Sequence, residues 1–404
     1  MSNKKVNTII RWWVTPKLPF EDIFEKHNFV SQWVMHPIKR RLARAYIKFL
    51  KKFTGIKIIG VTGSAGKSTT VRMIHSILNI NAKTVSTPVS IDPVYNIVNT
   101  ILKTAPWTKY LVLEMSVEYK REMDFYLWLA KPDMALVTNI YPTHTQFFGN
   151  TEGVYEEKKK IVEVLGVDGI CILNSENKWT KKMAKDTKAK VLWFGKGTEI
   201  YASDKKTNIM KATFDLNFDG KRTQISLGVP GDMFVENAIA AAAVGKALKV
   251  DSSGVKKGLE TFEAPTHRME IRKTRKGYTV VDESYNSNPK ALEASLEDFK
   301  RLAKDKKKIV ILGDMLELGA SEEKEHLKAG RSLSTYGVDY LIAVGKAAKN
   351  IYIGAKSSLG KKSFWVSDES QVLEVFEKLS SSGSLVLVKG SRSIGLEKVV
   401  SKIV

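Results

Sequence analysis

Short apolar runs alternate with longer amphipathic stretches along most of the chain, beginning at Ile56. Runs this short are typical of strands buried on both faces of a parallel sheet, with helices in the connections. Five of them precede residue 200: IKIIGV at 56–61, YLVLEM at 110–115, MALVTNI at 134–140, DGICILN at 168–174 and KVLWFG at 190–195. The pattern predicts a central α/β domain over residues 56–266.

The pattern changes after residue 200. TFDLNF at 213–218 and RTQISLGV at 222–229 alternate with a period of two residues, which predicts a small antiparallel sheet. The alanine-rich stretch at 236–248 predicts a tightly packed helix, with the domain ending near Pro265. A second series of apolar runs then predicts a Rossmann-like α/β domain over 267–404: YTVVDE, KIVILGD, YLIAV, SFWV and SLVLVKG.

Residues 1–55 have a different character from the rest of the chain, with three tryptophans and a basic helical segment. Apolar and aromatic residues recur there at helical spacing: Ile38, Leu42, Tyr46, Phe49 and Phe53. Basic residues fill the other face: Lys39, Arg40, Arg41, Arg44, Lys48, Lys51 and Lys52. A basic amphipathic helix of this kind can lie on an anionic membrane surface. The alternative is a helix that packs on the next domain and keeps a solvated basic face.

Composition limits the classes of protein that fit. Apolar residues make up 43% of the 404 residues, enough for ordinary globular cores. The single cysteine, Cys171, excludes an internal disulfide and favours a reducing compartment, so we expect a cytoplasmic protein. No signal peptide or membrane-spanning run is present, although peripheral attachment to a membrane stays open. The net charge of +22 favours anionic partners, but no nucleic-acid-binding motif accompanies it.

The stretch GVTGSAGKSTT at 60–70 is the strongest chemical signal. A glycine-rich turn after a strand, ending in Gly-Lys-Ser, predicts a loop whose amides cradle phosphates. Lys67 would neutralise the outer phosphates, and the Ser68 hydroxyl would ligate Mg²⁺. The spacing departs from the usual P-loop, because Val61 stands where the first glycine is expected. The predicted nucleotide-binding loop consists of Gly63, Ser64, Ala65, Gly66, Lys67, Ser68 and Thr69.

This loop and several later stretches resemble the muramyl-peptide (Mur) ligases and their folylpolyglutamate synthetase relatives. The form TGxxGKS-T-T is that of the loop in this family. The resemblance covers residues 56–404 and is closest to D-alanyl-D-alanine-adding members. Six further stretches strengthen it: LVLEMS at 111–116, TNIYPTHTQFFGN at 138–150, HRMEIR at 267–272, VVDESYNSNPKALEASL at 280–296, VILGDMLELG at 310–319 and LVKGSRSIGLE at 387–397.

The resemblance implies an ATP-dependent amide ligase that works in the synthesis of cell-envelope precursors. In this family, ATP phosphorylates a carboxylate, and the amine of an amino acid or dipeptide then displaces the phosphate. Lys67, His144 and Lys158 would be the catalytic residues, and Ser68, Glu114, His144 and Lys158 would surround Mg²⁺. Lys158 matches a family lysine that is carbamylated. Lys159 and Lys160 adjoin it, so a solvated basic helix face is the alternative.

The remaining residues carried over by the resemblance contact ATP or the amine substrate. The ATP contacts would be Asn237, Arg268, Asp282, Tyr285 and Asn286, with a ribose as the partner of Asp282. An Asx-type turn before Pro289 is the alternative for Asp282, Tyr285 and Asn286. Four residues of the C-terminal domain would face the amine substrate: Asp314, Glu317, Ser391 and Arg392.

The first 55 residues depart from the family pattern. Family members have an N-terminal domain of about a hundred residues that binds the UDP-sugar, a usual size for a small domain. Residues 1–55 do not match that domain, so the acceptor stays open. The alternatives are a Mur-like ligase acting on a poly-amino-acid or other polymer, a nucleic-acid-associated P-loop ATPase, and a non-catalytic protein that binds ATP.

Overall fold

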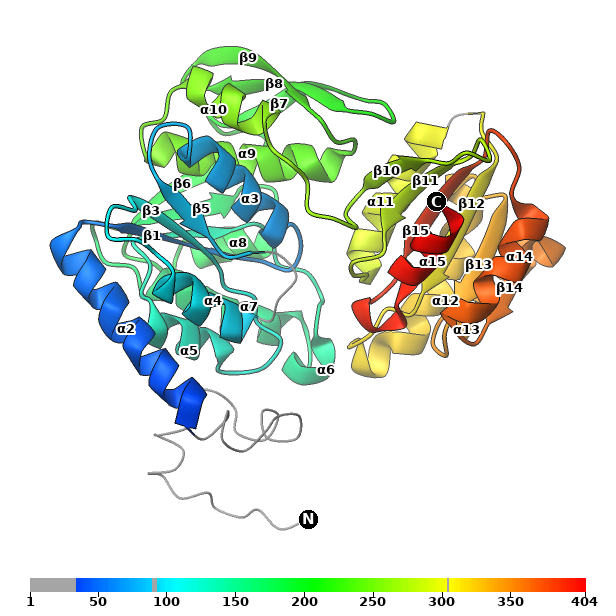
Figure 1. Ribbon diagram of the computed structural model, residues 1–404, viewed down its shortest axis with the longest axis horizontal. Helices are drawn as coiled ribbons and strands as arrows, with labels where there is room; N and C mark the ends of the chain where they lie inside the picture. Colours follow the sequence, from blue (N-terminus) through cyan, green and yellow to red (C-terminus); the bar gives the residue numbers. More distant parts are fainter. Residues whose placement is uncertain (1–33, 89–92, 304) are drawn as a thin grey trace, which may run out of the picture. The chain divides into compact units, whose positions relative to one another are not determined.

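The computed structural model describes residues 34–88, 93–303 and 305–404, and these form two compact units (Figure 1). One unit contains the chain up to Ala202 together with Leu216–Thr223 and Glu236–Thr261. The other contains Ser203–Asp215, Gln224–Val235 and Phe262–Val404. The three N-terminal tryptophans, Trp12, Trp13 and Trp33, lie outside the described residues.

The first unit is built on a six-stranded parallel sheet, as the alternation of apolar runs predicts. Its strands, in spatial order, are β2 (Thr84–Ser86), β3 (Tyr110–Glu114), β1 (Lys57–Thr62), β4 (Met134–Val137), β5 (Ile170–Asn174) and β6 (Lys190–Phe194). Its connections and flanks are helical: α2 (His36–Phe53), α3 (Lys67–Leu78), α4 (Pro93–Leu102), α5 (Glu122–Leu129), α6 (Thr145–Phe148), α7 (Thr151–Glu163), α8 (Lys178–Met183) and α10 (Ser252–Glu260).

A three-stranded sheet follows β6, in the order β7 (Tyr201–Thr207), β8 (Ala212–Phe218) and β9 (Lys221–Leu227). The turn between β8 and β9 consists of Asp219 and Gly220, with φ of 51° and 71°. Positive φ at both turn residues is the conformation that matches the twist of a tight hairpin. The alternating pattern therefore predicts β8 and β9 correctly, but β7 was not expected. Helix α9 (Asp232–Ala247) is the predicted alanine-rich helix.

The second unit contains another six-stranded sheet, parallel except for β10 at its edge. The order is β10 (Glu270–Lys273), β11 (Thr279–Glu283), β15 (Leu385–Lys389), β12 (Lys308–Gly313), β13 (Tyr340–Val344) and β14 (Ser363–Val366). The helices are α11 (Pro289–Ala303), α12 (Glu322–Ser332), α13 (Lys349–Leu359), α14 (Val372–Leu379) and α15 (Leu396–Ile403), with 3-10 turns η2 (Gly319–Ser321), η3 (Leu333–Tyr336), η4 (Gly360–Lys362), η5 (Glu369–Gln371) and η6 (Arg392–Ile394).

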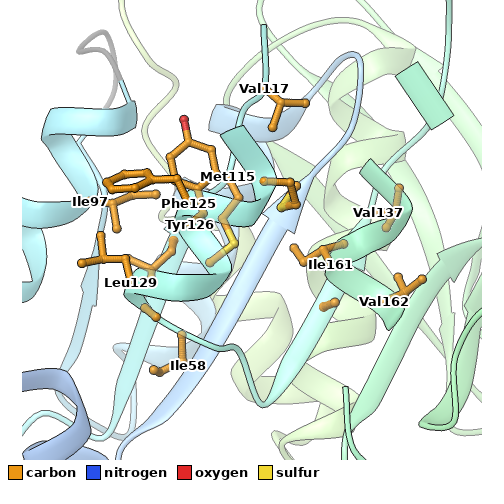
Figure 2. Packing of buried hydrophobic residues seen from close by; sticks show 14 of the residues in the cluster. Ile58, Ile97, Met115, Val117, Phe125, Tyr126, Leu129, Val137, Ile161 and Val162 are labelled. Carbon is orange, nitrogen blue, oxygen red and sulfur yellow. The ribbon is translucent and has the colours of Figure 1, made fainter. Parts of the chain in front are cut away.

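One face of the first sheet packs against α2, α4, α5 and α7. Alternate residues of the central strand separate between the two faces, so that Ile58 joins this core while Ile59 does not. Figure 2 shows part of the cluster, in which Met115 and Ile161 lie close together beside Val137. The short apolar runs therefore form buried strands, as their composition predicts, and the α/β fold with two six-stranded sheets is confirmed.

Helix α2 is docked on the first unit rather than standing apart from it. It packs against α4 and α5 (Figure 1), and Ala43, Ile47 and Leu50 belong to the core cluster. The Tyr46 hydroxyl donates to the carbonyl of Thr104 over 2.6 Å. Of the two alternatives for this segment, packing on the neighbouring domain is thus observed.

The orientation of α2 differs from the expected one. Two arginines assigned to the solvated face lie on the buried side, where Arg40 stacks 5.4 Å from the ring of Phe125 and Arg44 stacks 4.7 Å from that of Trp128. Aromatic faces attract a guanidinium and lower the cost of burying it. The apolar stripe expected to pack inward is exposed instead. None of the helices in the described segments has the length and apolar character needed to cross a membrane.

Two leucines on opposite sides of α2 test its docking. Leu50 is fully buried and Leu42 is 56% exposed. We expect Leu50→Ala to lower the free energy of unfolding by about 3 kcal/mol, because it leaves a cavity. Leu42→Ala makes the same change in helix propensity and should cost less than about 0.5 kcal/mol. Urea unfolding of the two variants measures the difference, and equal losses would contradict this docking.

Candidate functional site

The glycine loop between β1 and α3 has a backbone that requires glycine at two positions. Gly63 and Gly66 have φ of 149° and 81°, which side chains disfavour. A Cβ atom on Gly63 would lie 1.9 Å from Oγ1 of Thr138, and one on Gly66 would lie 2.1 Å from Oδ1 of Asn237. Gly66 is also the N-cap of α3, so the positive end of the helix dipole lies at this loop.

Asn139 holds the middle of the loop. The amide of Ser64 donates to the Asn139 carbonyl and the amide of Ala65 to its Oδ1, each over 2.9 Å. These two amides were expected to face a phosphate, but both have internal acceptors. Gly66 and the first turn of α3 follow them, and the N-terminal end of a helix has amides without an intrahelical acceptor. Thr69 lies in this turn and is buried.

Asn237, expected near the adenine, lies against this loop. It is buried on α9, and its Oδ1 accepts from the Thr70 hydroxyl over 3.3 Å. The same oxygen occupies the space that a side chain at position 66 would need. Its observed role is to hold the end of the loop and the start of α3 in place.

Gly60, which stands one place before the expected P-loop glycine, has a packing role. It lies within β1, where an added Cβ would be 2.9 Å from Cδ1 of Ile161 and 3.2 Å from Sδ of Met115. Figure 2 shows Ile161 and Met115 meeting over this strand. The missing side chain lets α7 lie directly on β1. Lys158 precedes Ile161 by about one helical turn.

Lys158 is buried in the first unit, with 1% of its surface exposed. Burial, together with the positive charge of Lys67, lowers the pKa of Lys158 well below its usual value. The carboxylates of Glu122, Glu157 and Glu114 oppose this effect. The structure thus brings Lys158 within electrostatic range of Lys67 and Glu114, and it favours the neutral amine.

The two neighbouring lysines have different surroundings, which separates them from Lys158. Lys159 pairs with Glu156 at 3.0 Å, and hydrogen bonding to this carboxylate raises its pKa. Lys160 pairs with Glu157 at 2.8 Å and Asp124 at 3.0 Å, and although burial opposes them, these partners raise its pKa. Both stay ammonium ions. A solvated basic face, the alternative for all three lysines, therefore does not describe Lys158.

The other expected metal ligands come from the carboxyl-terminal edge of the same sheet. Glu114 is the last residue of β3, beside Val61 of β1, and its amide donates a hydrogen bond to Oγ1 of Thr87 over 2.9 Å. Ser68 is buried in the first turn of α3. His144 is the N-cap of α6, with φ of 53°. Parallel strands end at one edge of a sheet, so this topology explains why such distant residues share it.

In the second unit, Tyr285 lies between two arginines. The guanidinium carbon of Arg268 lies 4.1 Å from the centre of its ring, and that of Arg392 lies 5.7 Å away. Arg392 is half-exposed and contacts Glu397 at 3.7 Å. Tyr285 follows β11 and Arg392 follows β15, and these strands are neighbours in the sheet. The structure therefore brings together three of the expected site residues.

Asp282, for which a ribose contact is predicted, makes internal hydrogen bonds in the structure. It is completely buried, and Oδ2 lies 2.7 Å from Nδ1 of His267. Its Oδ1 accepts from the amide and the hydroxyl of Ser284, at 3.0 and 2.7 Å. This is the Asx-type turn that was the alternative for this stretch. Asn286 is exposed and its Oδ1 accepts from the amide of Ser287 over 2.8 Å.

His267, Glu270 and Asp282 are the one group of potential metal ligands found close together among the described residues, with ligand atoms within 4.8 Å of one another. Arg272 supplies a positive charge to the group, at 2.9 Å from Glu270 and 3.9 Å from Asp282. Although burial opposes it, the hydrogen bond from Arg272 lowers the pKa of Glu270. An internal cation thus balances these carboxylates, and this group is not the expected metal site.

Two loops of the second unit are tied together at the ends of β12 and β15. The amide of Ser391 donates to the Asp314 carbonyl and the Leu316 amide donates to the Ser391 hydroxyl, each over 2.9 Å. Asp314 is buried, and its Oδ1 accepts from the amide of Ala348 over 2.6 Å. Glu317 follows with φ of 65°. The structure places these expected substrate residues together, with Asp314 and Ser391 holding the loops.

Two supporting residues were missed by sequence reasoning. Lys389 is buried, pairs with Glu283 at 3.0 Å and donates to the Asn286 carbonyl over 3.2 Å. His326 is completely buried, and its Nε2 accepts a hydrogen bond from the Met315 amide over 2.9 Å. The signal for Lys389 was a charged residue ending the buried run SLVLVK. A lysine at that position needs a partner inside the protein.

Comparison with known proteins identifies two family domains in the chain. Residues 61–245 match the Mur ligase middle domain, and residues 267–392 match the Mur ligase glutamate ligase domain. The chain belongs to the Mur ligase family. It is therefore an ATP-dependent, ADP-forming ligase that joins an acid to an amine, and the family expectation is confirmed.

Relatives of this Mur ligase include the UDP-N-acetylmuramoyl-tripeptide–D-alanyl-D-alanine ligase of Bacillus subtilis, which is 31% identical over 90% of this chain and 79% of its own. The crystal structure of MurF from Acinetobacter baumannii superposes with a TM-score of 0.82 at 24% identity, over 90% of this chain and 80% of its own. The structure of MurF from Thermotoga maritima in complex with ADP superposes with a TM-score of 0.79 at 23% identity, over 94% of this chain and 86% of its own. The two structures show a shared fold.

The requirement for glycine at position 66 is directly testable. Gly66→Ala should lower ADP affinity at least about tenfold, because the new methyl group displaces Asn237 from the loop in addition to straining the backbone by about 1–2 kcal/mol. Gly197 is the matched control, since its φ of 80° is the same and nothing lies within 4 Å of its Cβ position. Titration calorimetry with ADP compares the variants. Equal ADP affinity in Gly66→Ala and Gly197→Ala would contradict the role given to this loop.

Proposed function

We propose that this Mur ligase joins D-alanyl-D-alanine to a UDP-linked N-acetylmuramoyl tripeptide, in the cytoplasm, where ATP is available. The proposal is supported by the activity named for the 31% identical relative and by the buried Lys158, whose pKa is lowered by burial and by the charge of Lys67. The acceptor carboxylate attacks the γ-phosphorus of ATP, giving an acyl phosphate and ADP. The dipeptide amine then attacks the acyl carbon, phosphate leaves with the bonding electrons, and the amine loses a proton.

Each charge that develops in this reaction has a candidate partner in the first unit. The ammonium of Lys67 and the start of α3 would neutralise the phosphates, because fixed cations and dipoles stabilise charge that grows in the transition state. Asn139 and Asn237 hold this loop from both sides. They are positioning residues.

Mg²⁺ is the metal that the donor set fits. Ser68 and Glu114 offer oxygen atoms, which this cation prefers. A neutral Lys158 amine can react with carbon dioxide, forming an N–C bond and releasing one proton, and the resulting carbamate adds two further oxygens. His144 would complete the surroundings of the site. When bound, Mg²⁺ would polarise the phosphoryl oxygens.

In the second unit, the loops around Tyr285 would hold ligand groups. Arg392 can pair with the carboxylate of the incoming dipeptide, since its planar guanidinium suits bidentate pairing and is half-exposed. Ser391 and Asp314 would fix the loop from which Arg392 extends. Arg268, stacked on Tyr285, would contact ATP, with Asn286 and Glu317 at the rim of the two ligand sites.

An acceptor without the UDP-muramyl group is the second candidate. The described residues before β1 form helix α2, which packs into the core of the first unit. A poly-amino-acid or another envelope polymer with a free carboxylate would use the same ATP chemistry.

Phosphate release from ATP tests the reaction and its substrates together. We expect release to need both D-alanyl-D-alanine and the UDP-linked tripeptide, and Lys67→Ala to reduce it at least about 100-fold with an unchanged melting curve. Panels of single amino acids, the tripeptide without UDP, and polymer carboxylates serve as comparisons. Release stimulated only by a polymer would favour the second candidate. Turnover in Lys67→Ala equal to that of the natural chain would contradict the mechanism.

Carbamylation of Lys158 makes a separate prediction. Lys158→Ala should lose most activity and regain part of it with acetate or formate, which replace the carboxylate group. Lys159→Ala and Lys160→Ala are the matched controls and should keep their activity to within a few-fold. A ¹³C carbamate signal from labelled bicarbonate should be present in the natural chain and both controls, and absent from Lys158→Ala.

The pH dependence should have a definite sign. The lowered pKa of Lys158 means that the neutral amine persists to lower pH than in an ordinary lysine and is lost only as the pH falls through that lowered pKa. Added bicarbonate should therefore restore more activity on the acid side than at neutral pH. A carbamate signal that survives in Lys158→Ala would assign the modification elsewhere.

A further inference from the structure

Helix α2 presents a continuous apolar stripe to solvent, on the side opposite its docked face. We define the outer stripe as Ile38, Leu42, Ala45, Phe49 and Phe53, which recur every three or four residues. Four of them are large and exposed, with Ile38 at 42%, Leu42 at 56%, Phe49 at 50% and Phe53 at 64%. At 100° per residue the stripe covers an arc of about 80°. The rings of Phe49 and Phe53 lie 4.8 Å apart.

The inner face of α2 fixes this orientation. Ala43, Ile47 and Leu50 lie in the core of the first unit, and Arg40 and Arg44 stack on aromatic rings there. Rotating the helix to bury the outer stripe would remove these residues from their contacts. The docked orientation of α2 thus leaves the outer stripe on the exposed side.

Lysines border the outer stripe on both sides, and the helix contains no acidic residue. Helical spacing places Lys39 along one edge and Lys48 and Lys52 along the other, and all three are exposed. Lys51 is excluded from this group, because it pairs with Asp133 at 2.8 Å. Apolar side chains bordered by cations are the pattern of a helix that lies in the interface of an anionic membrane.

We propose that the outer stripe and its bordering lysines bind the surface of anionic lipid bilayers. Phe49, Phe53 and Leu42 would enter the boundary between headgroups and acyl chains, while the lysines pair with lipid phosphates. A second copy of the chain fits the face poorly, since two copies would bring like charges together on a protein that already carries +22. The proposal is independent of the ligase substrates and extends to the site at which the enzyme works.

Co-sedimentation with vesicles tests the apolar part. The full chain should bind vesicles that contain phosphatidylglycerol and not vesicles of phosphatidylcholine alone. Leu42→Ser with Phe49→Ser should weaken this binding at least about tenfold, because the removed apolar area no longer enters the bilayer. Met210→Ser with Ile353→Ser is the matched control, since both residues are exposed, at 57% and 49%, and lie far along the chain from α2. The control should bind as the natural chain does.

Charge reversal tests the lysines. Lys48→Glu with Lys52→Glu should reduce binding more than about tenfold, since each basic residue near an anionic surface contributes about fivefold. Lys324→Glu with Lys328→Glu makes the same change in net charge at the same helical spacing on α12, where both lysines are exposed. It should have a much smaller effect. Raising the salt from about 0.1 M to about 0.5 M should weaken binding by the natural chain.

Basal phosphate release and melting curves without vesicles verify that every variant is folded. Three outcomes would overturn the proposal: binding to neither type of vesicle, equal binding to neutral and anionic vesicles, and equal losses in the α2 variants and their controls. Sedimentation showing a dimer that Leu42→Ser with Phe49→Ser dissociates, without vesicle binding, would assign the stripe to a second copy of the chain. Failure of the ligase assay would leave these results unaffected.

Discussion

The close contact between α7 and β1 at Gly60 is the constraint on which the first unit's site depends. With no side chain at position 60, Ile161 reaches the strand itself, and Met115 of the neighbouring segment closes over the same place. An alanine there would press on both side chains, and α7 would move outward. Because Lys158 is carried by α7, such a movement would change its distance from Lys67. The packing of α7 on the sheet thus determines the electrostatic interaction between Lys158 and Lys67.

Burial and charge then divide the three consecutive lysines. Lys159 and Lys160 reach carboxylates and remain ammonium ions, while Lys158 enters the protein beside another cation. A shift of α7 by one residue would exchange these environments and would leave a paired ammonium where a neutral amine is needed. The acidic partners of Lys160 therefore serve the site indirectly, because they fix the rotation of the helix about its axis.

Sequence reasoning predicted the main strands, the two α/β series and the nucleotide loop, because buried runs and glycine spacing are local signals. It missed β7, a largely exposed strand of sequence YASDKKT without an apolar period, and the three-residue strand β2. It did not decide which of the three consecutive lysines, Lys158, Lys159 or Lys160, is buried, since spacing alone does not say which side chain faces inward. It also did not anticipate the hydrogen bonds that His267 and Ser284 make with the carboxylate of Asp282. Partners that are distant in sequence decide such cases.

Helix α2 shows how such long-range partners reverse a local pattern. Judged by composition alone, its arginines belong in water and its phenylalanines inside. The rings of Phe125 and Trp128 pack against the arginines instead, and Phe49 and Phe53, on the opposite side of the helix, are exposed. Exposing these rings to water has a free-energy cost that the inner contacts outweigh in the isolated chain. Contact of the outer stripe with an apolar surface would remove these rings from water and offset that cost. The packing that fixes α2 therefore also leaves an apolar surface free to bind.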